Sequence, residues 1–122
     1  MRIGYCCMKP QSAKAKGRKF QQEVRDMILE RFPDLTADDV RSTSMGAGGE
    51  DIQLSTAARR LLPIQIECKS KGKSAIHTMY DQAMDHGDYT AVLIVKKNHA
   101  EPLAIIPAEW FFDLMRKING NL

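Results

Sequence analysis

A carboxylate and an ammonium group stand two residues apart near the end of the stretch LPIQIECKSKGK, residues 62 to 73. Apolar and polar side chains alternate along most of this stretch, which is typical of a β-strand. The alternation places Glu67 and Lys69 on one face of the expected strand, with Ile64 and Ile66 on the other. The polar face therefore carries two oppositely charged side chains that could do chemistry together.

A second carboxylate, Asp51, lies in the alternating stretch EDIQLST, and fifteen residues separate it from Glu67. That spacing is enough for a strand, a turn and a return strand, so pairing would bring both carboxylates and Lys69 to one sheet surface. Two carboxylates and a backbone carbonyl, here that of Cys68, form a hard oxygen site suited to Mg²⁺ or Mn²⁺. Such an ion polarises a phosphodiester and lowers the pKa of a bound water. Lys69 would hold or help deprotonate that water, or neutralise charge on the phosphate.

Other charged residues could extend this site. Glu23 borders the apolar stripe of an expected helix, so its carboxylate could face the edge of the sheet and join the site. Its spacing is explained better by an ordinary glutamate exposed to solvent. Basic residues cluster at the start of that helix and after Glu67, and such clusters either contact phosphates or form a solvated tail and loop. The candidates for nucleic-acid contacts are Lys16, Arg18, Arg41, Lys71 and Lys73.

Composition restricts the class of protein. The chain has 122 residues, enough for one domain with a single core. Its net charge of +3 is too small to indicate a nucleic-acid partner by itself. Its three cysteines include no Cys-x-x-Cys pair, which argues against a disulfide framework and a structural zinc site. We expect no membrane segment, because no apolar run is long enough to span a bilayer. The absence of a secretory signal and the odd thiol count favour the cytoplasm.

Hydrophobic periodicity predicts the order helix, three strands, helix, two strands, helix. Helices are expected at 16–32, 74–86 and 108–118, and strands at 40–44, 50–56, 61–70, 89–97 and 103–107. The nearly all-apolar run 89–97 suggests a strand buried on both faces. The expected fold is a single α/β domain, 16–122, with a mixed central sheet of about five strands flanked by helices. A basic, flexible segment, 1–15, precedes it.

The order Asp51, then Glu67-Cys68-Lys69, resembles the motif of the PD-(D/E)XK nuclease superfamily, with Glu50 where that motif has proline. More narrowly, the chain resembles archaeal-type Holliday junction resolvases and allied small phage nucleases. The matching residues are Lys16, Gly17, Glu23, Arg41, Gly48, Gly49, Asp51, Ile52 and Gln82. The resemblance spans residues 16 to 115. It implies a restriction-endonuclease-like fold and a Mg²⁺- or Mn²⁺-dependent DNA endonuclease, often a homodimer. It also implies Glu50 as a substitute ligand and Gln82 as a nucleic-acid contact.

Several readings stay open beside a junction-resolving nuclease acting on branched or duplex DNA. One is a nicking, repair or restriction-type nuclease, and another is a non-catalytic nucleic-acid-binding module on the same fold. The intact set of Asp51, Glu67 and Lys69 argues against the non-catalytic module. Aromatic residues 110–112 could stack nucleotides, although core or dimer packing explains them better. If the chain is phage-encoded, we expect it to act in the cytoplasm of a bacterial host.

Overall fold

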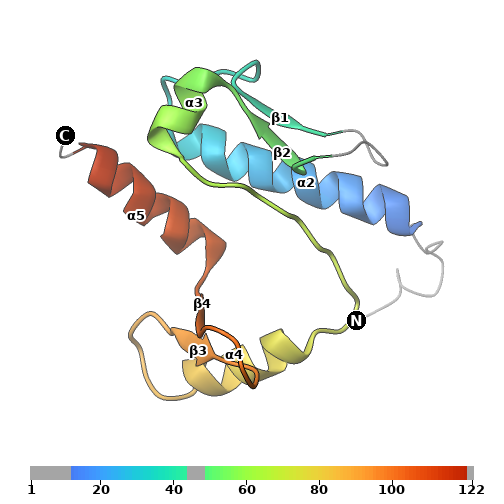
Figure 1. The fold of residues 1–122 in the computed structure, drawn as a ribbon, viewed down its shortest axis with the longest axis vertical. Coiled ribbons are helices and arrows are strands. Elements are labelled where there is room, and N and C mark those ends of the chain that lie inside the picture. Colours follow the sequence, from blue (N-terminus) through green and yellow to red (C-terminus); the bar gives the residue numbers. More distant parts are fainter. Residues whose placement is uncertain (1–11, 44–48, 121–122) are drawn as a thin grey trace, which may run out of the picture. The chain divides into compact units, whose positions relative to one another are not determined.

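The computed structural model describes residues 12–43 and 49–120. Its elements, in chain order, are α2 (Ala13–Arg31), β1 (Val40–Ser42), β2 (Ile52–Leu54), α3 (Thr56–Leu61), α4 (Ala75–Met84), β3 (Leu93–Val95), β4 (Leu103–Ile105) and α5 (Ala108–Gly120) (Figure 1). The chain divides into two compact units, Met1–Ser70 and Lys71–Leu122. Each unit contains one two-stranded antiparallel sheet.

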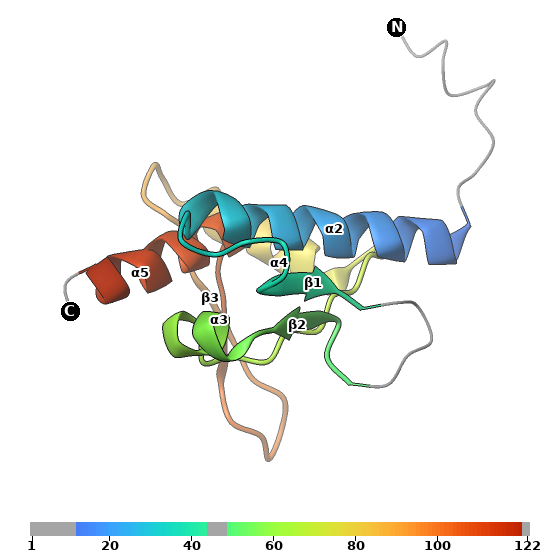
Figure 2. The ribbon, with the colours of Figure 1, turned by 90° about the horizontal axis from the view of Figure 1, so that it is seen from above.

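The first unit is built on a helix lying against a strand pair. The Ser12 side chain caps α2 by accepting a hydrogen bond from the backbone N of Ala15, which satisfies one of the free N–H groups at the helix start. α2 packs along β1, and β1 pairs with β2 in the register Ser42 opposite Ile52 (Figure 2). The core of the unit consists of buried apolar residues from α2, β1, β2, α3 and the connections between them: Val24, Ile28, Phe32, Leu35, Val40, Ile52, Ala58 and Leu62.

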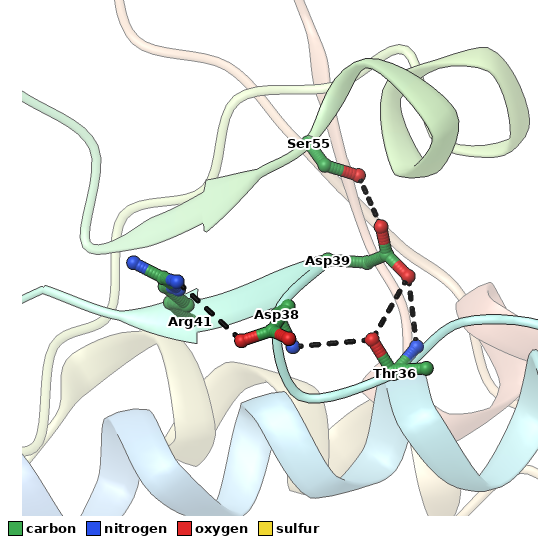
Figure 3. A network of polar contacts seen from close by, with 5 residues as sticks. All are labelled: Thr36, Asp38, Asp39, Arg41 and Ser55. Carbon is green, nitrogen blue, oxygen red and sulfur yellow. Dashed lines mark hydrogen bonds and ion pairs between the residues drawn. The ribbon is translucent and has the colours of Figure 1, made fainter.

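A polar network fixes the start of α3 (Figure 3). The Asp39 carboxylate accepts hydrogen bonds from the backbone N of Thr36 (2.9 Å) and from the Ser55 hydroxyl (2.7 Å). Ser55 also donates its backbone N–H to the Asp39 carbonyl (2.8 Å). The Ser55 Oγ in turn accepts from the backbone N of Ala58 (3.1 Å) and so caps α3. The chain before β1 and the chain after β2 are therefore joined at the point where α3 begins.

The second unit contains α4, the β3–β4 pair and α5. The Ser74 side chain caps α4 by accepting from the backbone N of His77 (3.4 Å), and the Tyr80 hydroxyl donates to the Ala91 carbonyl (2.9 Å). Phe112 on α5 is buried, and its ring centroid lies 5.4 Å from that of Phe111.

The predicted central sheet of five strands is wrong, because the structure has two separate two-stranded sheets. The decisive segment is 62–70, which forms neither helix nor strand and follows α3 as an extended chain (Figure 1). Its exposure alternates as expected, yet among the described residues only one backbone-to-backbone hydrogen bond, from Asp51 N to Ile66 O, joins it to the chain before β2. Alternation reports which side chains are buried, and it does not supply the ladder of hydrogen bonds that a strand requires.

The other elements match the sequence more closely. The three expected helices are confirmed, although α2 already begins at Ala13, within the segment expected to be flexible; residues 1–11 lie outside the described part. The expected strands 40–44, 50–56 and 103–107 are shorter in the structure, and residue 44 lies outside the described part. The run 89–97 was expected to be buried on both faces, which is wrong. Only Leu93–Val95 is a strand, it pairs with β4 alone, and Ile94 is 64% exposed.

Candidate functional site

Asp51 stands immediately before β2 and links two stretches of backbone. Its carbonyl accepts a hydrogen bond from the backbone N of Thr43 (2.8 Å), just after β1. Its own N–H donates to the Ile66 carbonyl (3.1 Å) on the extended segment 62–70. The Asp51 backbone is therefore held between the end of β1 and the segment that carries Glu67.

The Asp51 side chain reaches the same segment. Its Oδ2 accepts a hydrogen bond from the backbone N of Cys68 at 2.6 Å. A bond from an N–H group to an ionised carboxylate is charge-assisted, which makes it shorter and stronger than a bond between neutral groups. The structure thus brings Asp51 against Glu67-Cys68-Lys69, through a side-chain contact in place of the strand ladder that the sequence predicted.

Glu67 and Lys69 lie on one side of the extended segment, with Lys69 Nζ 3.0 Å from Glu67 Oε2. The hydrogen bond with Glu67 and its negative charge raise the pKa of Lys69 above its ordinary value, and the charge of Asp51 adds to this. The ammonium group therefore stays protonated at neutral pH. Of the roles expected for Lys69, this favours neutralising charge on a phosphate over accepting a proton from water.

The Cys68 side chain is half-buried beside these carboxylates. Burial raises the pKa of the Cys68 thiol to about 11, and the negative charges of Asp51 and Glu67 contribute. Because the thiolate is the nucleophile and the metal ligand, a thiol held neutral is poorly suited to either task. Cys68 contributes to this site through its backbone, whose N–H already holds Asp51.

Glu50, the expected substitute ligand, is paired with Arg59 of α3. The Arg59 Nη2 lies 3.3 Å from both carboxylate oxygens of Glu50, and its Nη1 donates to the Ile64 carbonyl. Arg59 is not among the residues expected at the site, because residues 57–60 lie between the expected strands 50–56 and 61–70. A signal was present in Ser55, a favoured N-cap residue, followed by a short run of good helix formers.

The remaining candidates are not drawn into this group. Glu23, Lys16 and Arg18 are exposed residues of α2, and within 12–43 and 49–120 none of them forms a hydrogen bond or ion pair with Asp51 or Glu67. Arg41 on β1 lies 3.5 Å from the carboxylate of Asp38. Three exposed candidates belong to the second unit and are not among the residues that the first unit brings together: Lys71, Lys73 and Gln82.

The donor types around Asp51, carboxylate and carbonyl oxygens, are those that Mg²⁺ and Mn²⁺ prefer. Among the described residues no three His, Cys, Asp or Glu side chains gather into a metal-binding group. Mg²⁺, however, is commonly bound through one or two carboxylates and keeps several waters. Asp51 and Glu67 each use one oxygen in the contacts above, and each has a second oxygen that takes part in neither. With the Cys68 carbonyl they form a hard oxygen set, which suits such an ion.

Comparison with known proteins gives no relative for this chain. No protein-family model matches it, and neither a curated protein nor a solved structure matches it significantly. The resemblance to PD-(D/E)XK nucleases stays a prediction that rests on the motif residues. As for membranes, no described helix combines the length and the apolar character needed to cross one.

Proposed function

We propose that the chain is a metal-dependent DNA endonuclease that hydrolyses phosphodiester bonds, with Asp51, Glu67 and Lys69 at its active site. The observation that carries this proposal is the 2.6 Å hydrogen bond from Cys68 N to Asp51 Oδ2. It joins residues far apart in sequence and brings one carboxylate to a segment that carries another carboxylate and an ammonium group. Two carboxylates beside an ammonium group are parts that metal-assisted phosphodiester hydrolysis can use.

Each residue has a distinct role in this proposal. Asp51 and Glu67 would hold the ion, and the Cys68 N–H orients the Asp51 carboxylate toward the site. When bound, Mg²⁺ or Mn²⁺ supplies Lewis acidity toward the phosphate and an acidified water. Lys69 offers its ammonium group to the phosphate oxygens that gain charge. The proton of the attacking water passes to solvent or to a group other than Lys69.

Exposed cations provide the contacts to the DNA backbone. Lys71 and Lys73 follow Lys69 closely in sequence and are exposed. The first turns of α2 carry another exposed set, Lys14, Lys16, Arg18 and Lys19. Such contacts position a protein on DNA without reading its sequence. Two finer proposals, a preference for branched DNA and a homodimer, rest on the resemblance. Action in the cytoplasm rests on the odd thiol count, and that cytoplasm is a bacterial host's if the chain is phage-encoded.

Asp51→Asn tests the active site directly. We expect it to abolish Mg²⁺-dependent cleavage of plasmid and four-way-junction DNA while leaving DNA binding intact, because it removes one anionic ligand and keeps the side-chain volume. Glu67→Gln should behave alike, whereas Lys69→Met should still bind Mn²⁺ in a calorimetric titration yet fail to cleave. Asp34→Asn, at an exposed aspartate of the same unit, is the matched control and should keep full activity.

The assay also separates the competing functions. Cleavage by Asp51→Asn at the wild-type rate would show that the proposed active site is wrong. A linear duplex and single-stranded DNA, run beside the junction, distinguish a junction resolvase from a nuclease with another target. A wild-type protein that binds DNA tightly and cleaves none of these substrates would favour the non-catalytic binding module.

A further inference from the structure

We infer that Arg59 is a positioning residue that sets the separation of Asp51 from the segment carrying Glu67, an inference that rests on the proposed function. Arg59 lies on neither of the segments that carry the proposed metal ligands. It projects from α3 and binds both of them, with Nη2 at the Glu50 carboxylate and Nη1 at the Ile64 carbonyl. Glu50 directly precedes Asp51, and Ile64 lies three residues before Glu67.

The guanidinium group suits this task because its donors are fixed in one plane. A single rigid group that binds two segments fixes their spacing, which a flexible lysine with one charged nitrogen cannot do equally well. The Arg59 and Glu50 side chains are 39% and 30% exposed, so their ion pair is better shielded from solvent than the pair of Glu67 with Lys69. Two further bonds between the same segments run from Asp51 N to Ile66 O and from Cys68 N to Asp51 Oδ2. Arg59 therefore reinforces a junction that holds few other polar contacts.

The position of Arg59 is itself fixed from the far side of α3. This helix has only six residues, too few to be stable alone, and it depends on its cap and on packing. Ser55 caps this helix and also donates a hydrogen bond to Asp39. Ala58, a residue of the helix, is fully buried. The polar network of Figure 3 thus continues through α3 to Arg59 and from there to both sides of the candidate site.

The consequence for function is geometric. Two carboxylates on separate segments bind one ion well only when their separation is held, and loss of a contact that orients a metal ligand commonly costs about 10- to 100-fold in metal affinity or activity. Arg59→Met removes both contacts and should lower Mn²⁺ affinity and kcat by about tenfold, with DNA affinity nearly unchanged. Arg59→Lys keeps the charge without the fork, and its effect should be intermediate.

The experiment compares Arg59→Met, Arg59→Lys and Arg60→Met in the full chain. Arg60 is the neighbouring exposed arginine of α3 and serves as the control for charge and for loss of an arginine from this helix. Thermal melts establish a temperature at which each variant is folded. Three quantities are then measured there: Mn²⁺ affinity by calorimetry, cleavage kcat and KM, and amide hydrogen exchange at Asp51 and Cys68. If Arg59→Met does not fold, Glu50→Gln replaces it, since it weakens the ion pair and keeps the arginine.

The expected result is faster exchange at the Asp51 and Cys68 amides, weaker Mn²⁺ binding and lower kcat for Arg59→Met, with Arg60→Met unchanged. A lower melting temperature with unchanged exchange, metal affinity and kcat would overturn the positioning role and leave Arg59 an ordinary stabilising residue. A wild-type chain that binds no Mn²⁺ and cleaves no DNA would overturn the proposed function, and the catalytic meaning of Arg59 would fall with it. Exchange does not depend on activity, so the two failures are distinguishable.

Discussion

Ser55→Ala is expected to destabilise the first unit more than the loss of an N-cap alone. The Ser55 hydroxyl accepts from Ala58 N at 3.1 Å and donates to Asp39 Oδ1 at 2.7 Å, and alanine removes both contacts. Loss of an N-cap serine costs about 1 kcal/mol. Loss of the bond to Asp39 adds to this. For a chain of this size, each 1 kcal/mol lowers Tm by roughly 3–6 °C.

Ser74→Ala is the matched control, because Ser74 caps α4 through a longer, exposed contact of 3.4 Å to His77 N, and its side chain has no described carboxylate partner. Urea titrations followed by circular dichroism, with thermal melts beside them, measure both variants. Ser55→Ala should lower stability by more than Ser74→Ala does. Equal losses would show that the Ser55–Asp39 bond contributes nothing to stability.

The pH dependence of the same variant gives a second check. Hydrogen bonds from Thr36 N and the Ser55 hydroxyl hold the pKa of Asp39 below its ordinary value of 3.8. A lowered pKa means that the native state binds this proton less readily than the unfolded chain does. Its stabilising contribution is therefore present above pH 3.8 and is lost as pH falls through the lower native pKa. The stability difference between wild type and Ser55→Ala should shrink on acidification below pH 4, whereas a constant difference would contradict the proposed link to Asp39.

Three further predictions concern the site and its surroundings. The pKa of the Cys68 thiol is raised from 9.0 to about 11, so in a chain with Cys6→Ser and Cys7→Ser it should react with iodoacetamide at pH 8 about a hundredfold more slowly than free cysteine. Adding Asp51→Asn should speed the reaction, because it removes a negative charge that raises this pKa. Reaction of Cys68 at the rate of free cysteine would contradict the raised pKa. Lys71→Gln with Lys73→Gln should weaken DNA binding for every sequence and reduce the slope of log K against log salt by about 1.8, whereas an unchanged slope would remove this loop from the interface. Light scattering should give a dimer at micromolar concentration, and a monomer with or without DNA would count against a junction resolvase while leaving the nuclease proposal in place.

The sequence predicted α2, α4 and α5 well, because each has a clear apolar period and clear ends. Val24, Ile28 and Phe32 repeat at helical spacing and are all buried, and Ser74 caps α4 at the start expected for it. It also predicted that Asp51 and the Glu67 segment would be neighbours, since the chain between them allows a return. It could not predict the contact itself, because one hydrogen bond from a backbone N–H to a side chain leaves no periodic pattern in the sequence.

The central sheet was predicted wrongly and Arg59 was missed, for different physical reasons. Alternation in 61–70 and the apolar run 89–97 describe how side chains partition between buried and exposed faces. Strand pairing depends on which backbones lie side by side, and among the described residues β3 and β4 form strand hydrogen bonds only with each other. α3, in contrast, is too short to show an apolar period, so residues 57–60 resemble a connection between two strands. The signals for this helix are its N-cap serine and the helix-forming residues that follow it.

The contrast between Glu50 and Glu67 explains why one of two nearby glutamates is the better candidate ligand. Arg59 Nη2 lies 3.3 Å from both carboxylate oxygens of Glu50, whose side chain is 30% exposed, so moving Glu50 onto an ion would leave a partly buried guanidinium group without its carboxylate. Glu67 and Lys69 are 62% and 71% exposed, and an ion pair so open to solvent contributes little to stability. The two residues can therefore separate at small cost in free energy. Glu67 could then bind a divalent ion, and Lys69 could bind a phosphate oxygen. In the proposed function, Glu50 in its ion pair with Arg59 would help to place Asp51, and the more exposed Glu67 would take part in the chemistry.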